Sequence, residues 1–375
     1  MQLEKFINAD EVVQKDLEFI CNNLEKELHL MSGKNLLITG GAGFIGSNAA
    51  HYFYQKKWQV YVFDNLSRKG TYFNIKWLKK ETNVRFIRGD IRKFNELSKT
   101  LSNINPNVII HCAGQVAVTT SFLNPREDFE INALGNLNVL ESIRVNKLKS
   151  TVIYTSTNKV YGNLDSNKVK INKNRYVYKN NIRGIDEKNR TDFHSPYGCS
   201  KGAADQYVRD YSRIYGINSY VLRQSCIYGP NQFGIEDQGW LAWFVIASIL
   251  EKKITVFGNG KQVRDLLYID DLNRLFEILA NNKKIDIDRV YNVGGGYKFS
   301  LSILELLEFL EKKIGKKIKV NFSKWRAGDQ KVYISNNLRL KKNFGWEPLI
   351  SPKVGIKKLM SWVYNNKKLI SQTLA

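Results

Sequence analysis

A glycine-rich segment between an apolar run and a helical pattern constrains the fold of this chain more than any other feature. Residues 35–39 read Asn-Leu-Leu-Ile-Thr, which is typical of a buried strand, and residues 40–46 read Gly-Gly-Ala-Gly-Phe-Ile-Gly. A helical apolar pattern through Ala49, Ala50 and Phe53 follows. The glycines fit both G-x-G-x-x-G and G-x-x-G-x-x-G, and such a turn lets backbone N–H groups approach a diphosphate at the start of a helix.

An acidic residue at the end of the next strand supports the same interpretation. Val60–Phe63 is apolar, and Asp64 follows it, 18 residues after Gly46. A carboxylate at this position can accept hydrogen bonds from both hydroxyls of an adenosine ribose. Because Asp64 would repel a 2′-phosphate, the sequence predicts NAD as the cofactor, and Arg68 and Lys69 nearby leave NADP open as an alternative.

Further strand and helix units predict an α/β fold with a doubly wound parallel (Rossmann) sheet. Apolar runs at 84–87, 108–110 and 151–154 read as strands that alternate with helices. Ligands of such sheets bind at the carboxyl ends of the strands. We therefore expect Asp90 to reach the adenine and 113–115 to run beside the cofactor, whereas His111 is interpreted as a packed histidine.

The segment Ser195–Lys201 is the strongest candidate for chemistry. Ser195 suits a helix cap and Pro196 the first helical position, so Tyr197 and Lys201 share one helix face at a spacing of four residues. We expect the ammonium to pull the pKa of the phenol toward neutrality, as a general base working on an alcohol requires. The alternative is an ordinary amphipathic helix surface.

Composition excludes several other classes of protein. The formal net charge of +23 is spread over the chain in lysine pairs such as Lys252-Lys253, without a nucleic-acid-binding motif, so we expect no nucleic-acid partner. The longest apolar stretch, 240–250, is too short to span a bilayer, and no signal peptide is evident, so we expect a cytoplasmic protein without a membrane partner. The spacing of Cys21, Cys112, Cys199 and Cys226 predicts reduced thiols and no metal site.

Three regions are expected along the chain. Residues 1–33 form an N-terminal helical extension with a helix over 8–30, residues 34–222 form the NAD-binding domain with the catalytic helix, and residues 223–375 form a smaller α/β substrate-binding domain whose segments interleave with the first. Residues 162–193 lack periodicity and read as a long excursion, and 258–265 reads as a loop. Arg264 and Arg326 would clamp a diphosphate if they converge.

The glycine turn, Thr157 at the end of a later strand and Tyr-x-x-x-Lys together resemble the extended short-chain dehydrogenase/reductase superfamily, from about Lys34 to the end of the chain. Longer segments are similar to its CDP-paratose 2-epimerase family, also called CDP-tyvelose 2-epimerases. These segments are 63–70, 113–117, 156–162, 192–207, 237–240 and 258–265.

The resemblance implies a role for each matching residue. Thr157 would hydrogen-bond the reacting sugar alcohol, Tyr197 would act as base and acid, and Lys201 would hold the nicotinamide ribose and lower the pKa of Tyr197. A nucleotide-diphosphate sugar, with a CDP-sugar favoured, would contact Thr157, Asn158, Arg264 and Arg326, and the protein would be a homo-oligomer (dimer or tetramer). Tightly bound NAD would be held by Gly40, Gly43, Phe44, Ile45, Gly46, Asp64, Asn65, Asp90, Ile91, Ala113, Gln115, Tyr197 and Lys201.

The expected reaction is inversion at C2 of CDP-paratose to give CDP-tyvelose. A C2–H bond without an adjacent carbonyl is not acidic, so inversion would proceed through a transient 2-keto sugar and resident NAD. Related 4,6-dehydratases typically follow the active-site threonine with Asp and Glu, whereas Asn158 and Lys159 stand here. A UDP-hexose 4-epimerase and a non-catalytic NAD-binding scaffold are the alternatives.

Overall fold

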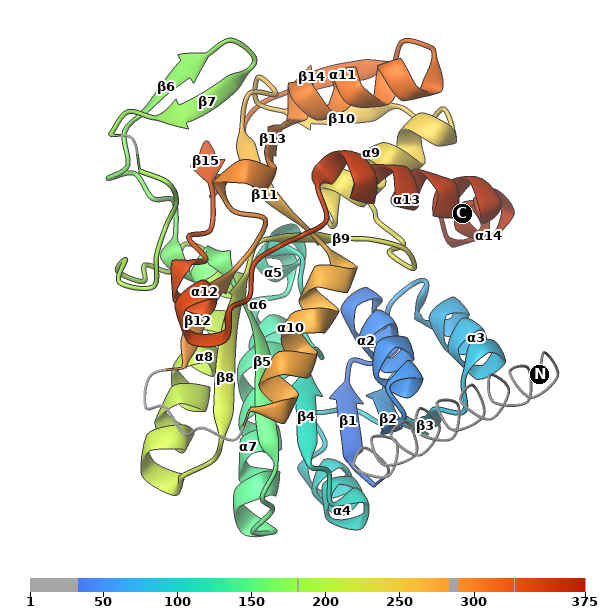
Figure 1. Cartoon of the computed structure of the whole chain (residues 1–375), viewed down its shortest axis with the longest axis vertical. Helices are drawn as coiled ribbons and strands as arrows, with labels where there is room; N and C mark the ends of the chain where they lie inside the picture. Colours follow the sequence, from blue (N-terminus) through green and yellow to red (C-terminus); the bar gives the residue numbers. More distant parts are fainter. Residues whose placement is uncertain (1–32, 181, 283–288, 327, 375) are drawn as a thin grey trace, which may run out of the picture.

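The computed structural model describes residues 33–180, 182–282, 289–326 and 328–374. The expected helix over 8–30 and Cys21 lie outside these ranges. Figure 1 shows two stacked parts: a large parallel sheet with its helices in the lower half, and smaller sheets with α9, α11 and α13 above it.

The central sheet has seven strands in the order β12-β8-β5-β4-β1-β2-β3, and every neighbouring pair is parallel (Figure 1). Leu36 and Ile38 pack on one face and Leu37 on the other, which is why the strand sequences read as continuous apolar runs. The doubly wound fold is confirmed. Its strands are β1 (Asn35–Thr39), β2 (Gln59–Asp64), β3 (Arg85–Arg88), β4 (Val108–His111), β5 (Thr151–Thr157), β8 (Ser219–Gln224) and β12 (Val290–Val293).

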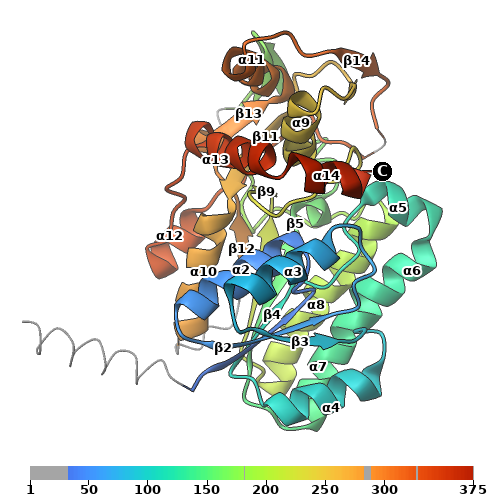
Figure 2. The ribbon, with the colours of Figure 1, turned by 90° about the vertical axis from the view of Figure 1, so that its right-hand side faces the viewer.

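Helices cover both faces of this sheet (Figure 2). One face carries α2 (Phe44–Gln55), α3 (Thr71–Glu81) and α10 (Ile269–Asn281), and the other carries α4 (Phe94–Ile104), α7 (Gly135–Val145) and α8 (Pro196–Tyr215). Strand β12 and helix α10 both come from the second half of the chain, so the chain returns to the first sheet after leaving it. Between β4 and α7 lie α5 (Val118–Leu123), α6 (Pro125–Phe129) and a π-helix (Glu130–Leu134).

The upper part is a smaller α/β assembly. Strand β11 (Val263–Tyr268) pairs with β9 (Cys226–Tyr228), β13 (Ser300–Ser302) and β15 (Val332–Tyr333). A capping box formed by Ser302 and Glu305 starts helix α11. The remaining elements are β10 (Ile254–Phe257) paired with β14 (Val320–Ser323), α9 (Trp240–Ile249), α11 (Ile303–Ile314), α12 (Leu338–Phe344), α13 (Pro352–Asn365) and α14 (Lys367–Leu374).

Two local expectations differ from the structure. The excursion over 162–193 contains an antiparallel hairpin, β6 (Val169–Asn172) and β7 (Arg175–Tyr178), whose pairing compensates for weak apolar periodicity. Residues Val263–Asp265 belong to strand β11 because neighbours on both sides supply hydrogen bonds there. Strand β5 ends at Thr157, as expected, and β8 pairs with it through Gln224.

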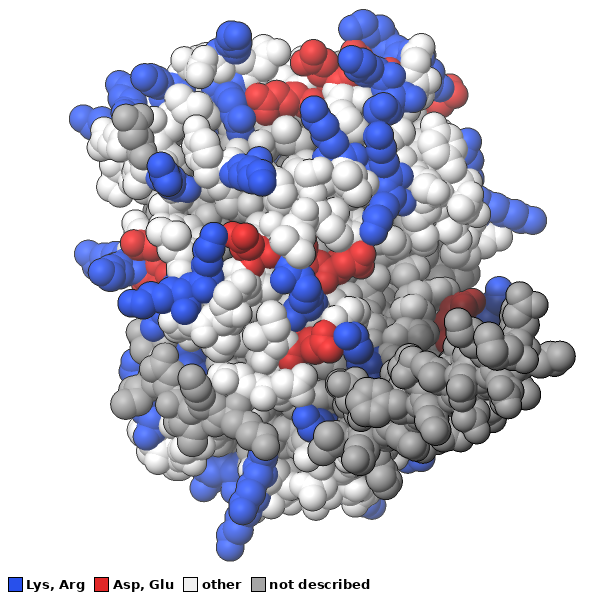
Figure 3. Space-filling view, viewed as in Figure 1, with Lys and Arg blue, Asp and Glu red and all other residues white. Residues whose placement is uncertain are grey.

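The surface bears positive charge widely. On the face in Figure 3, Lys and Arg side chains are distributed among neutral residues and a smaller number of Asp and Glu side chains. Across the described residues, no helix combines the length and apolar character that crossing a membrane requires.

Candidate active site

A cavity of about 710 Å³ extends from the glycine turn to the start of helix α8. Gly40, which has φ 64°, and Gly46 border it. A Cβ atom at Gly40 would lie 2.5 Å from the Ala113 nitrogen, and one at Gly46 would lie 2.5 Å from the Gly40 oxygen. Side chains at these positions would therefore break the turn. The predicted cofactor residues Gly43, Phe44, Ile45, Asp64, Asn65, Asp90, Ile91, Ala113 and Gln115 all line the same cavity.

Asp64 lies at the end of β2, where the sequence placed it. Its carboxylate accepts hydrogen bonds from the backbone N–H groups of Ala42 at 3.1 Å and Leu66 at 2.8 Å. Burial raises its pKa, and the two backbone hydrogen bonds oppose that shift. Asp64 thus holds the glycine turn in place in addition to presenting an acceptor to the cavity.

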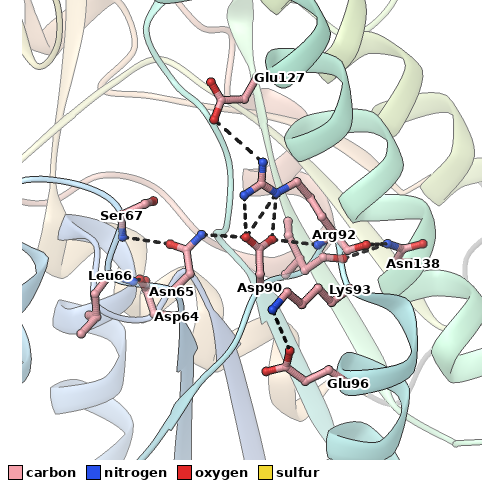
Figure 4. Close-up of polar contacts among 11 residues, drawn as sticks. Asp64, Asn65, Leu66, Ser67, Asp90, Arg92, Lys93, Glu96, Glu127 and Asn138 are labelled. Atoms are coloured by element: carbon pink, nitrogen blue, oxygen red, sulfur yellow. Dashed lines mark hydrogen bonds and ion pairs between the residues drawn. The ribbon is translucent and has the colours of Figure 1, made fainter.

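Asp90 is the centre of a polar cluster at the end of the cavity that Asp64 lines (Figure 4). Asn65 Nδ2 donates to it at 3.0 Å, and Arg92 Nη2 and Nε donate at 2.7 and 3.1 Å. Burial would raise the pKa of Asp90, but the hydrogen bonds from Arg92 and Asn65 outweigh it and lower the pKa to about 2. Arg92 also lies 3.9 Å from Glu127, so the Asp90 carboxylate is anchored as an anion. Arg92 and Glu127 were not predicted, because no spacing rule joins them.

Thr157, Tyr197 and Lys201 line one cavity together with the glycine turn. Thr157 closes strand β5, and the other two lie in the first turns of α8. The expected cap is present: Ser195 Oγ accepts a hydrogen bond from the Gly198 N–H at 2.9 Å. Strand β5 and helix α8 therefore bring the three expected catalytic side chains to one cavity. Tyr197 is only 7% exposed.

The expected effect of Lys201 on the phenol is wrong for this structure. Burial raises the pKa of Tyr197 to about 12, and a hydrogen bond with Thr157 opposes the rise. Lys201 Nζ instead donates to the Thr155 carbonyl at 2.7 Å and lies 4.3 Å from the centroid of the Tyr154 ring. Burial lowers the pKa of Lys201 to about 8. Tyr197 and Lys201 share a helix face, but the carbonyl of Thr155 on β5 holds the Lys201 ammonium, so the ammonium does not lower the pKa of the phenol.

His111 is packed, as the sequence suggested. It is 1% exposed, and its Nδ1 lies 2.6 Å from Thr39 Oγ1. Burial and the nearby Lys201 charge lower its pKa to about 3. Within the described ranges, no group of three or more His, Cys, Asp or Glu side chains could hold a metal, and Cys112, Cys199 and Cys226 are free thiols.

In this structure each of the two arginines expected to bind a diphosphate is paired with a carboxylate. Arg264 Nη2 donates to Asp329 Oδ1 at 2.6 Å. Arg326 Nη2 donates to Asp237 Oδ1 at 2.8 Å, and its guanidinium lies 3.7 Å from the centroid of the Phe257 ring. Arg326 borders a second cavity of about 560 Å³, whereas its partner Asp237 lines the first. Each arginine is thus paired with its own carboxylate at the edge of the site.

The two residues after Thr157 join the sheet to the 328–330 segment. Asn158 Nδ2 donates to Gln330 Oε1 at 3.3 Å. Lys159 Nζ donates to the Gly328 carbonyl at 3.1 Å and lies 3.9 Å from Asp329 Oδ1. Asp329 therefore faces both Lys159 and Arg264, and Lys159 is a second cation beside the expected substrate residues.

The cavity residues fit a dinucleotide. The turn accepts no side chain at Gly40 or Gly46, a carboxylate ends β2, and an ammonium lies at the other end of the cavity. These are the groups that a diphosphate, an adenosine ribose and a nicotinamide ribose require.

Comparisons with known proteins agree with this geometry. CDP-paratose 2-epimerase of Salmonella typhi is 44% identical over 333 residues, which cover 87% of this chain and 98% of that protein. UDP-glucose 4-epimerase of Thermotoga maritima, solved with UDP-glucose, has a TM-score of 0.76 at 27% identity and matches 89% of this chain and 99% of its own. UDP-glucuronic acid 4-epimerase of Bacillus cereus, solved with UDP-glucuronic acid and NAD, has a TM-score of 0.75 at 28% identity and matches 88% and 99%.

A family profile described as GDP-mannose 4,6 dehydratase matches residues 37–359. The match spans both the central sheet and the smaller assembly above it. The chain therefore belongs to the GDP-mannose 4,6 dehydratase family, within the extended short-chain dehydrogenase/reductase superfamily.

Proposed function

We propose that this chain is an NAD-dependent nucleotide-sugar epimerase that inverts C2 of CDP-paratose to give CDP-tyvelose. The observation that carries the proposal is the meeting of Thr157, Tyr197 and Lys201 in the cavity that begins at the glycine turn. The choice of substrate rests on the 44% identity to a CDP-paratose 2-epimerase along nearly all of that relative's length.

The chain's own residues supply the proton chemistry. Tyr197 Oη accepts the proton of the reacting sugar hydroxyl and later returns it. Thr157, which hydrogen-bonds Tyr197, holds that hydroxyl in line. Bound NAD supplies reversible hydride transfer, which oxidises C2 to a transient ketone and reduces it from the opposite face, and its oxidised ring adds positive charge that favours the phenolate. Lys201 adds a fixed cation at the end of β5.

The residues that follow Thr157 argue against elimination of water. A dehydratase needs a carboxyl acid and a carboxylate base beside the keto sugar, whereas Asn158 and Lys159 supply an amide and an ammonium. Both side chains are bound to the 328–330 segment. An oxidised sugar in this site would thus be reduced again instead of losing water.

Substrate binding would use the arginines at the edge of the site. Arg264 and Arg326 each hold a carboxylate that a diphosphate can replace with stronger, bidentate contacts. In this proposal the diphosphate replaces Asp329 and Asp237 as the partner of the two arginines. The nucleotide stays anchored while the keto sugar rotates to present its opposite face. The same arrangement would serve a UDP-hexose 4-epimerase, so C2 and C4 inversion must be separated by experiment.

The test is the stereochemistry of the product. Purified protein is incubated with CDP-paratose and, separately, with UDP-glucose, and the sugar configuration is read by NMR. We expect inversion of the CDP-sugar at C2, and conversion of UDP-glucose alone would overturn the choice of substrate. Tyr197→Phe should abolish turnover and still bind NAD; undiminished activity would refute the assigned base, whereas conversion of neither sugar by the unmodified protein would favour the scaffold alternative.

We also propose a cytoplasmic homo-oligomer, a dimer in its simplest form. Exposed apolar side chains lie on α5, α6, the π-helix and α8, which pack together. Leu123 on α5 is 86% exposed. An apolar surface of this kind fits a second copy of the chain. Light scattering should report a dimer, and Leu123→Asp should shift it toward monomer. The other members of the surface are Phe122, Phe129, Leu134, Tyr207, Ile214 and Tyr215.

A further inference from the structure

A buried amide nitrogen at the end of strand β8 has no hydrogen-bond partner in the described part of the chain. It is Nε2 of Gln224, a residue that is 6% exposed. The residues on either side do have partners, because Asp205 binds Arg223 and Asp265 accepts a hydrogen bond from the Ser225 hydroxyl. A buried amide without a partner costs free energy. Its presence therefore indicates a group that binds it when the site is occupied.

Gln224 lies beside the expected reacting centre. It lines the cavity of about 710 Å³ together with Thr157, and the two residues are register partners in the parallel pairing of β8 with β5. Residues paired in this way lie about 5 Å apart and point to the same face of the sheet. An earlier pair in the same register, Ile153 and Tyr220, agrees with this, because both side chains pack in one core cluster. The Gln224 amide is thus adjacent to the Thr157 hydroxyl.

The order of the strands separates Gln224 from the residues that fit the cofactor. The glycine turn follows β1 and Asp64 ends β2, and these are the groups that fit a diphosphate and an adenosine ribose. From β2 the sheet continues through β1, β4 and β5 to β8. Gln224 therefore lies on the side of Thr157 away from the glycine turn. A ligand group that reaches its amide belongs to the sugar half of the site.

The chemistry of an amide suits this place. The amide both donates and accepts hydrogen bonds, so it can bind a sugar oxygen in more than one orientation of the sugar. In the proposed function Tyr197 and Thr157 take the reacting hydroxyl, which leaves Gln224 for another oxygen of the sugar. A hydrogen bond between neutral groups is weaker than the charge-assisted contacts of a diphosphate. It therefore breaks more readily when the keto sugar rotates.

We propose that Gln224 is a sugar-binding residue: its amide hydrogen-bonds a sugar oxygen other than the reacting hydroxyl and so holds the reacting carbon beside Thr157. This inference rests on the proposed function, because it takes a nucleotide sugar as the ligand. It applies equally to inversion at C2 and at C4.

The test separates the sugar from the nucleotide. Calorimetric titrations of NAD-loaded Tyr197→Phe, which should not convert the sugar, compare CDP-paratose with CDP and UDP-glucose with UDP. Gln224→Met in the same background keeps the side-chain length and removes the amide. The Kd of the bound nucleotide sugar should rise about fivefold, as expected for one neutral hydrogen bond, whereas the Kd values of CDP, UDP and NAD should not change. Gln206→Met is the matched control, because it makes the same change at an exposed position of α8.

Unfolding of the ligand-free protein in urea is a second readout. Because Nε2 of Gln224 lacks a partner among the described residues, Gln224→Met should have the same or a higher urea midpoint. A lower midpoint, or failure of both Gln224→Met and Gln224→Leu to fold, would show a structural role and overturn the proposal.

An unchanged Kd for the nucleotide sugar, or an equal loss of affinity for the nucleotide alone or for NAD, would also overturn the proposal. If the unmodified protein converts neither sugar, the proposed function fails. The titrations measure binding and not turnover, so a fivefold change confined to the nucleotide sugar would still assign Gln224 to the sugar.

Discussion

The buried ion pair between Asp205 and Arg223 supports the end of strand β5, and its removal gives a quantitative test. The two side chains are 0% and 3% exposed, and two Arg223 nitrogens bind the carboxylate. Ser156 Oγ also donates to Asp205 at 2.9 Å, and Arg223 Nη1 donates to the Tyr161 hydroxyl at 3.0 Å. Ser156 directly precedes Thr157, so the pair supports the backbone that carries the Thr157 hydroxyl.

Asp205→Asn leaves a buried guanidinium without its counter-charge. Breaking such a pair from one side costs about 3–5 kcal/mol. Replacing both partners, as in Asp205→Leu with Arg223→Met, removes both buried charges. The Ser156 hydroxyl and the Gln206 amide then lose their acceptor, but Gln206 is exposed and can bind water. Tyr161 keeps its hydrogen bond to Asn292, so we expect a cost of about 1–2 kcal/mol for the double variant.

The assay is equilibrium unfolding in urea followed by tryptophan fluorescence, for Asp205→Asn, for Asp205→Leu and Arg223→Met as single variants, and for the double variant. Asp210→Asn is the control, because it makes the same chemical change at an exposed position of α8 and should stay within about 0.5 kcal/mol of the unmodified protein. A cost below about 1 kcal/mol for Asp205→Asn, or additive single costs in the double variant, would refute the reasoning.

Three further outcomes follow from single residues. The pKa of His111 is lowered to about 3, so below pH 6.5 the unfolded chain binds a proton at this residue that the folded chain does not bind. The free energy of unfolding should therefore fall by about 2 kcal/mol from pH 7 to pH 5. Urea midpoints at the two pH values should show a smaller loss in His111→Asn. Arg264→Met should raise KM for the nucleotide sugar about 30-fold, which corresponds to the loss of about 2 kcal/mol of charge-assisted hydrogen bonding, and should change kcat less. An unchanged KM would exclude a contact between Arg264 and the diphosphate. Asp64→Asn should raise NADP affinity relative to NAD about tenfold in calorimetric titrations, because a like charge is removed; an unchanged ratio would contradict the ribose assignment.

Local chain geometry explains which parts of the structure could be predicted. The glycine turn and the cap at Ser195 depend on residues within one turn of each other, and both are present. The strands of the central sheet are buried on both faces, so their apolar runs are readable without knowing their neighbours. The strands of the hairpin β6–β7 have one buried side chain, Tyr178, and carry no such pattern.

Long-range polar contacts explain what could not be predicted. Lys201 meets the Thr155 carbonyl, and Arg264 meets Asp329, across 46 and 65 residues of sequence. No spacing rule covers such distances, and the i, i+4 rule correctly placed Tyr197 and Lys201 on one helix while giving the wrong direction for the pKa of the phenol. Asp128 likewise reads as a surface residue of a short polar helix until Ser200 and Gln115 are seen to close over it.

The arrangement of charges around the cavity links these contacts to the chemistry. Asp90 holds Arg92, Asp329 holds Arg264, and Asp237 holds Arg326, so several cations near the site are matched by an acid despite the large positive charge of the chain. In the proposed function a diphosphate would replace the carboxylates at Arg264 and Arg326, and its binding energy would be the difference between two sets of ionic contacts. At the reacting centre the order is reversed, because a neutral carbonyl, and not a carboxylate, holds Lys201. The ammonium is therefore left to act on groups that enter the cavity, which a direct ion pair would prevent.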